Sequence, residues 1–297
     1  MKFLPCLLFM MLCLKMQGQP CAAPPKFMQN RGFTPGRAAL STSEKRQMGL
    51  VLLEIGNSTD QNAAKKSKQY QHPSWDDQGY LSSITRDRNG HIYVAPKPNV
   101  NMLHTPRESL NTIFRVHTQN ETMSPFQKLP GSVQISNENP YGILGLAYDC
   151  FTDHLLVSTV NGSSQKKENG KVYAIDVNSG RIMPLVNHLD VLGLVVAKTT
   201  NSGFELLLAS ARESVIYSLP IDENLKVLGP AKPVISLEGL GPRGDDRGRK
   251  MEYIDDQLIV YGTPFYYNLS APSISKETKY RFNLDNETNN WQLVSIE

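Results

Sequence analysis

One unit of two hairpins recurs four times along this sequence, and it constrains the fold more than any other feature. The first hairpins begin at Leu81, Ile143, Val191 and Arg249, so successive starts are 62, 48 and 58 residues apart. A second hairpin follows each of them, beginning at Thr112, Gly170, Ser214 and Thr278. Self-similarity at a spacing of roughly 40 to 60 residues is typical of propellers and solenoids.

Each hairpin has the same order of elements: an apolar strand, a polar turn and a second strand rich in β-forming residues. The segment 81–98 (LSSITRDRNGHIYVAPKP) aligns with 143–162 (ILGLAYDCFTDHLLVSTVNG), and the second hairpins turn on Asn-Ser-Gly, Asp-Glu-Asn and Asp-Asn-Glu. Such residues favour tight reversals and positive φ. Long stretches with helical periodicity are absent, which argues against an α/β fold. The sequence therefore predicts an all-β fold, a β-propeller of four-stranded antiparallel blades.

The number of blades depends on residues 25–79, which repeat less clearly. Gly49–Ile55 is a good strand, the stretch 58–77 is polar and expected to be loop, and one helix is expected near 42–47. This region could supply a divergent blade, a strand that closes the last blade, or both. Five blades are the first choice and six the second. We expect a closed ring, because an open array of sheets exposes edges and an apolar face.

The N-terminus has the order of a secretory signal peptide. A basic start, Met1-Lys2, precedes twelve apolar residues, Phe3–Leu14, and then a polar and small-residue stretch. A membrane span needs roughly 20 apolar residues, so we expect export, with cleavage between Gln17 and Ala23 and no membrane span afterwards. The expected organisation is a signal peptide at 1–20, an extended segment at 21–40 and a single propeller domain at 41–297.

Charge and cysteine content set further expectations. The net charge of +3 comes from 31 basic and 28 acidic residues, which creates no single-sign field for nucleic acid or a membrane surface. We expect a monomer. Of four cysteines, Cys6 and Cys13 leave with the signal peptide, and Cys21 and Cys150 could pair after export. Asn-x-Ser/Thr occurs five times, which marks candidate glycosylation sites if the cell is eukaryotic: Asn57, Asn120, Asn161, Asn268 and Asn286.

Two of the repeated motifs carry a family resemblance. The pattern Asp-x-x-Gly-x-Ile-Tyr-Val within Ile84–Val94, and Val-Tyr-Ala-Ile-Asp-x-x-Ser-Gly at Val172–Gly180, resemble blades of the NHL-repeat and gluconolactonase-like β-propeller superfamily. The resemblance covers roughly 80–296 and implies a fold more than a function. It implies either a binding platform, as in NHL domains, or a sugar-lactone hydrolase with a central divalent cation. No lactonase metal motif matches residue by residue, so no catalytic residue is carried over.

Propeller geometry points to candidate site residues in the segments that lead into the innermost strands, 75–80, 137–142, 187–192 and 244–250. Each of these segments carries an acid or an amide, and all four would meet at one mouth of the central channel. The candidate ligand-binding residues are Asp76, Asp77, Glu138, Asn139, Asn187, Asp190, Asp245, Asp246, Arg243 and Arg247. Hard oxygen ligands suit Ca²⁺ or Mg²⁺, and a metal set would be Asp77, Asn139, Asp190 and Asp245. The alternative is that these residues serve turns and strand starts.

The remaining chemistry-bearing residues have structural explanations. Arg243 and Arg247, with Arg249 and Lys250, could bind an anionic group at the mouth or neutralise its acids. Asp87, Asp149 and Asp176 are better explained as turn residues than as catalytic ones. The aromatic run Phe265–Tyr267 suits blade packing, with a ligand-binding face as the alternative.

Two function classes remain open. The first is a secreted propeller that binds a small ligand or a protein partner at the channel mouth without catalysis. The second is a divalent-metal-dependent hydrolase of lactones or related sugar derivatives. The absence of GxSxG, HExxH and GxxxxGK[ST] motifs favours the first class.

Overall fold

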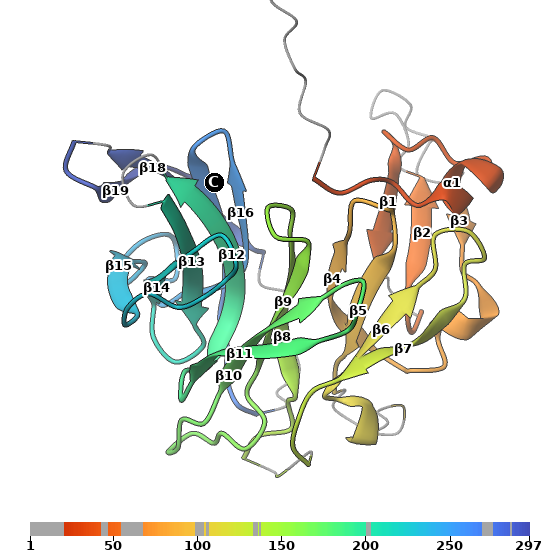
Figure 1. Ribbon diagram of the computed structural model, residues 1–297, viewed down its shortest axis with the longest axis horizontal. Coiled ribbons are helices and arrows are strands. Elements are labelled where there is room, and N and C mark those ends of the chain that lie inside the picture. The colour runs from red at the N-terminus through yellow and green to blue at the C-terminus, as the bar shows by residue number, and fades with distance from the viewer. Residues whose placement is uncertain are drawn as a thin grey trace, which may run out of the picture.

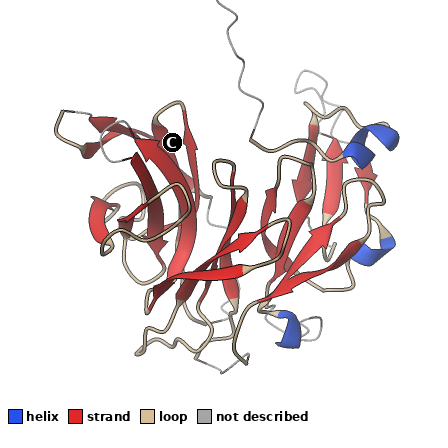
Figure 2. Ribbon diagram, in the orientation of Figure 1, coloured by secondary structure: helices blue, strands red, loops and turns tan. Residues whose placement is uncertain are grey.

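The chain folds into five antiparallel sheets that follow one another in sequence order. The computed structural model describes residues 21–42, 47–54, 68–98, 104, 107–132, 136, 138–199, 203–268, 276–285 and 287–297. In Figure 1 the sheets run from red and orange at one side, through yellow and green, to cyan and blue at the other. Figure 2 shows that helix is confined to short segments. The expected all-β, five-bladed propeller is confirmed.

Each sheet consists of consecutive strands in sequence order. The first contains β1 (Ala38–Ser41), β2 (Val51–Glu54) and β3 (Gln69–Tyr70); the second β4 (Leu81–Arg86), β5 (Ile92–Pro96), β6 (Thr112–Val116) and β7 (Met123–Lys128). The third contains β8 (Ile143–Asp149), β9 (His154–Thr159), β10 (Lys171–Asp176) and β11 (Ile182–Asn187). The fourth contains β12 (Val191–Thr199), β13 (Gly203–Ser210), β14 (Val215–Ile221) and β15 (Lys232–Ser236). The fifth contains β16 (Arg247–Ile254), β17 (Gln257–Thr263), β18 (Thr278–Asp285) and β19 (Asn290–Ile296).

Aspartates close the hairpins of this fold, as the sequence indicated. The Asp87 carboxylate accepts the backbone N–H groups of Asn89 and His91, at 2.9 Å each. Asp176 accepts Ser179 N–H at 2.6 Å, and such backbone hydrogen bonds lower the pKa of the Asp176 carboxyl. Asp149 accepts Phe151 N–H in the same way, at 3.2 Å. These carboxylates are therefore part of the turns.

Four apolar clusters join successive sheets. They lie between the first and second sheets, the second and third, the third and fourth, and the fourth and fifth. Among the described residues, no fifth cluster joins the last sheet to the first. The expected closed ring therefore lacks an apolar interface at this seam.

The surface of the last sheet explains why no apolar interface is needed between the last and the first sheet. Its face away from the fourth sheet is polar, with Lys250 Nζ paired to Glu252 at 2.6 Å and Arg281 Nε to Glu297 at 2.9 Å. Tyr261 donates its hydroxyl to Glu252 at 3.1 Å. Because these groups satisfy one another on the sheet surface, the face needs no apolar neighbour.

An N-terminal strap passes from the β8–β9 turn of the third sheet along the turns of the second sheet to the first sheet (Figure 1). Helix α1 (Lys26–Asn30) buries Phe27 and Met28, and Phe27 N–H donates to the carbonyl of Thr118 at 3.0 Å. A disulfide joins Cys21 to Cys150, which lies in the β8–β9 turn. The segment 21–40, expected to be extended, thus contains α1 and most of β1. The helix expected near 42–47 falls largely outside the described residues.

The other short helices in the described residues are 3₁₀ turns at Pro73–Trp75 and Arg107–Ser109. None of the helices in the described part of the chain has the length and apolar character to cross a membrane.

Candidate functional site

The innermost strands β4, β8, β12 and β16 all begin at the same end of the propeller, which we call the start rim. In a four-stranded antiparallel blade, the loop between the second and third strands returns to this end. Segments 138–142, 187–190 and 243–246 therefore meet the loops at 160–170, 211–214 and 264–268 there. Hydrogen bonds between these segments connect different sheets.

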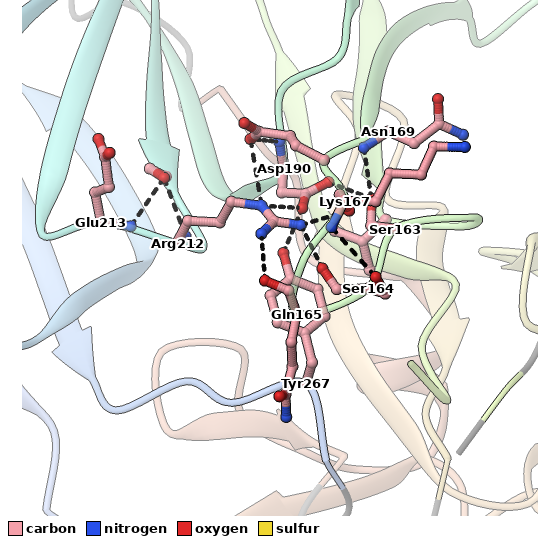
Figure 3. A network of polar contacts seen from close by, with 12 residues as sticks. Ser163, Ser164, Gln165, Lys167, Asn169, Asp190, Arg212, Glu213 and Tyr267 are labelled. Atoms are coloured by element: carbon pink, nitrogen blue, oxygen red, sulfur yellow. Dashed lines mark hydrogen bonds and ion pairs between the residues drawn. The ribbon is translucent and has the colours of Figure 1, made fainter. Parts of the chain in front are cut away.

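Asp190 forms the centre of the polar network in Figure 3. It directly precedes β12 and is completely buried. Its carboxylate accepts Tyr267 OH at 2.5 Å and Arg212 Nε at 2.7 Å through Oδ2, and Ser163 Oγ at 2.5 Å through Oδ1. Burial, together with the hydrogen bond to Asp190, raises the pKa of the Tyr267 hydroxyl, so that this group stays a donor.

The Arg212 guanidinium joins Asp190 to a neighbouring loop, as Figure 3 shows. It donates to the carbonyl oxygens of Ser164 at 2.6 Å, Lys167 at 2.7 Å and Gln165 at 3.2 Å. Its positive charge is also balanced by Glu168, at 3.7 Å. Arg212 and Asp190 therefore fix the loop of the third sheet against the fourth.

Asp246 repeats this arrangement one sheet further on. It directly precedes β16, is completely buried, and accepts Tyr280 OH at 2.7 Å. Arg243 binds it in a bidentate manner, Nε to Oδ1 at 2.6 Å and Nη2 to Oδ2 at 2.9 Å. This hydrogen bond raises the pKa of the Arg243 guanidinium. A buried aspartate with one arginine and one tyrosine is thus a repeated structural device at the start rim.

Two further candidates, Asn139 and Arg247, extend the network. The buried Asn139 amide donates to the carbonyl oxygens of Val160 at 2.7 Å and Ser163 at 2.9 Å. Arg247 Nη2 donates to the carbonyl of Arg212 at 2.9 Å, and its Nη1 donates to Ser214 Oγ at 2.5 Å and to the Asp245 carbonyl. Both residues bind backbone, so both hold loops in place.

An aromatic loop from the last sheet crosses to the third and fourth sheets. Tyr141 donates its hydroxyl to the carbonyl of Asn268 at 3.3 Å, and the Tyr141 and Phe265 rings lie 5.4 Å apart. Phe265 in turn contacts Tyr267, at 5.3 Å between ring centroids. Tyr266 projects outwards, with 58% of its surface exposed. The run Phe265–Tyr267 thus bridges sheets at the rim, and one of its rings is free to contact a ligand.

Two cations at the start rim come from sheets far apart in sequence. Lys97 follows β5, and its backbone N–H donates to the carbonyl of Tyr80 at 2.7 Å. Lys97 is exposed at the surface, but the surrounding protein partly desolvates its ammonium; this desolvation, and then the positive charge of Arg249, lower the pKa of Lys97. Within the described residues, no carboxylate pairs with the Lys97 ammonium. In the part of the chain that the structure describes, Arg249 forms one ion pair, with Glu277 at 3.1 Å, and both side chains are nearly half exposed.

The structure places the other candidates apart from this network. Asp76, Asp77, Glu138, Asn187 and Asp245 are exposed. Asp77 lines an open surface cavity of about 680 Å³ with Phe114 and Lys128, beside the outer strands of the second sheet. Asn187 is the last residue of the outermost strand β11. Hence the ten candidates do not converge on one point.

The carboxylates of the start rim do not fit the metal site that the gluconolactonase-like resemblance implies. Asp190 and Asp246 already accept arginine and tyrosine donors, and the Asn139 side-chain oxygen accepts Tyr141 N–H at 3.0 Å. In the described part of the chain, no group of three or more His, Cys, Asp or Glu side chains could hold a metal ion.

The candidate glycosylation sites differ in accessibility. Asn120 lies exposed in the turn between β6 and β7, and Asn268 is also exposed. Asn161 is half-buried and donates its amide to the carbonyl of Ser132 at 2.9 Å. Asn57 and Asn286 lie outside the described residues.

Sequence reasoning missed the partners that give the rim aspartates their role. Arg212, Tyr280 and Ser163 were not among the candidates, and Tyr267 was considered only as part of an aromatic run. The antiparallel order of the blades could have identified Arg212 and Ser163, since both follow the second strand of a unit and so return to the start rim.

Comparisons with known proteins concern the fold only. No family model matches the sequence, and no curated protein matches it. Among solved structures, the chain is similar to regucalcin, a calcium-binding protein from Agrobacterium tumefaciens, with 11% identity, a TM-score of 0.48 and coverage of 84% of this chain. It spans 66% of that regucalcin chain, just under two thirds.

Two further solved structures show a comparable likeness. A glucose dehydrogenase is 11% identical, with a TM-score of 0.45 over 81% of this chain and 78% of its own. TolB from Acinetobacter baumannii is 13% identical, with a TM-score of 0.47 over 83% of this chain and 49% of its own. At these scores the likeness carries no argument about function, and the five-bladed propeller fold rests on the sheets themselves.

Proposed function

We propose that this protein is a non-catalytic binding module that holds a small ligand with a carboxylate or phosphate group at the start rim. The observation that carries the proposal is the pair Lys97 and Arg249. These cations come from the second and the last sheet and are both exposed at the start rim, where the charge of Arg249 helps to lower the pKa of Lys97. A bound anion would relieve their mutual repulsion and pair with the Lys97 ammonium. The exposed Tyr266 supplies an aromatic surface on the same rim.

The buried acids of the rim support binding over catalysis. A general acid or a metal ligand needs a carboxylate that can reach its substrate or ion. Asp190 and Asp246 instead hold arginine and tyrosine side chains of their own propeller. Among the described residues, no contact favours the alternative of a metal-dependent hydrolase.

Isothermal titration with inorganic phosphate tests the proposal. We expect Lys97→Ala and Arg249→Ala each to weaken binding about tenfold or more, since a charge-assisted hydrogen bond contributes about 1.5–3 kcal/mol. Lys226→Ala is the matched control, because it removes one exposed positive charge from the β14–β15 turn at the opposite end. Equal binding by all four proteins would contradict the proposal, as would no phosphate binding by the wild type.

The affinity for phosphate should also fall as the pH rises. The fall should occur at a lower pH than it would for a lysine with an ordinary pKa. The pKa of Lys97 is lowered, so its ammonium loses the proton at a lower pH than usual. Only the protonated form attracts the anion, so binding is strongest below this pKa and is lost as pH rises through it. Titrations across the alkaline range measure this loss, which should be absent in Lys97→Ala.

We further propose that the protein acts outside the cytosol. The signal-like N-terminus and the Cys21–Cys150 disulfide support this proposal, because disulfides persist in oxidising compartments. Mass spectrometry of the protein recovered from culture medium or periplasm would show whether the chain begins between residues 17 and 23.

A further inference from the structure

The outermost strands of the four-stranded sheets share a register shift. In three of them a proline precedes the unpaired residue, and in the last strand it does not. Each has a register shift at the same point, where one residue of the outer strand is left without a partner. Just before that residue stand Pro125 in β7, Pro184 in β11 and Pro233 in β15, paired with Phe114, Tyr173 and Tyr217. In β19 the matching residue is Leu293, paired with Phe282.

The prolines protect the edges of three sheets. An outermost strand presents unpaired N–H and C=O groups that can template another strand, and proline, which has no N–H, is one of the devices that blunt such an edge. β19 lacks this protection. It pairs with β18 and, in the described part of the chain, with no other strand.

The side chains of β19 suit an interface. Leu293, Val294 and Ile296 are 41%, 54% and 41% exposed, although they lie on a regular strand. From Asn290 to Ile296 the strand carries no charge. The adjoining Glu297 is paired with Arg281 at 2.9 Å and Lys279 at 3.8 Å on its own sheet.

Contrary to the monomer expected from the sequence, we propose that β19 pairs antiparallel with β19 of a second copy of this chain, giving a two-fold symmetric dimer with one continuous eight-stranded sheet. A partner edge must itself be free of proline, and among the outermost strands of the four-stranded sheets only β19 meets this condition. Self-pairing about a two-fold axis is isologous, so every apolar contact is made twice. It also sets an uncharged strand against an uncharged strand, which avoids like-charge repulsion. Seven residues provide an edge about 23 Å long.

The dimer does not depend on the proposed ligand. β19 is the outermost strand of the last sheet, whereas Lys97 and Arg249 lie at the start rim. Variants of β19 should therefore bind phosphate as the wild type does, and a failure of either proposal leaves the other standing.

Light scattering coupled to size-exclusion chromatography tests the dimer over loading concentrations from about 1 μM to 1 mM. We expect the wild-type mass to double as concentration rises. Leu293→Pro, which restores the pattern of the other three sheets, should stay at the monomer mass. Val294→Lys, which places a charge on an exposed edge position, should do the same if the proline variant fails to fold. Leu228→Lys, at another exposed apolar residue, is the control and should dimerise.

Two results would overturn the proposal. One is a wild-type protein that stays at the monomer mass at every concentration. The other is a dimer that persists unchanged in the folded Val294→Lys variant, which would locate the contact elsewhere.

Discussion

Replacing Asp190 with alanine is expected to lower the free energy of unfolding by about 3–5 kcal/mol, as removal of one partner from a buried ion pair does. The carboxylate is completely buried, and its loss leaves the Arg212 guanidinium and the Tyr267 hydroxyl without their acceptor. It also frees the loop at 164–167, which Arg212 holds through three carbonyl groups. Urea denaturation followed by circular dichroism measures the change.

Two further variants serve as a control and as a second test of the same effect. Asp245→Ala removes an exposed carboxylate next to the buried Asp246, so its effect should lie within about 0.5 kcal/mol of zero. Asp246→Ala should resemble Asp190→Ala, because Asp246 has the same kinds of partner. If Asp190→Ala were no more destabilising than Asp245→Ala, the structural role of the rim aspartates would be refuted.

Breaking the Cys21–Cys150 disulfide is expected to cost about 4–5 kcal/mol. The bridge closes a loop between residues 129 positions apart, and in the chain-entropy model the stabilisation grows with loop length. The strap that it anchors also buries Phe27 and Met28 against the first and second sheets. Denaturation of Cys21→Ser, Cys150→Ser and the double variant gives the cost.

The double variant provides the internal control. If the bridge is the source of the stability, the double variant should be no less stable than either single one, and a reducing agent should destabilise only the wild type. A reducing agent that left the wild type unchanged would show that the bridge contributes nothing.

The repeats predicted most of the fold because each unit encodes its own hairpins. Ile84–Val94 contains a turn aspartate, a glycine with φ of +81° at Gly90 and two apolar strands, and all of this is local information. The first sheet was harder to predict, since its strands have only four, four and two residues and are separated by polar stretches. The polar face of the last sheet was not predicted either. Its position depends on which face of β16 and β17 has a neighbouring sheet, and the sequence does not show this.

The sequence indicated where some of the candidate residues lie but not which side chains they contact. Asn139, Asp190 and Asp246 do lie at the start rim, as the order of strands indicated. Their partners, however, come from loops up to 77 residues away, as in the pair Tyr267 and Asp190. Without those partners, a buried structural aspartate and an open metal ligand look the same in sequence. Lys97 lies between Pro96 and Pro98 at the end of a strand. Nothing in its sequence context indicated a binding role.

Thermal unfolding of the wild type and Lys97→Ala, with phosphate or with calcium, tests the central claim most directly. The claim is that cations of the start rim bind the ligand while its buried acids serve the fold. It predicts that phosphate raises the unfolding midpoint of the wild type more than that of Lys97→Ala, and that calcium raises neither. A midpoint raised by calcium, with no difference between the two proteins in phosphate, would contradict it.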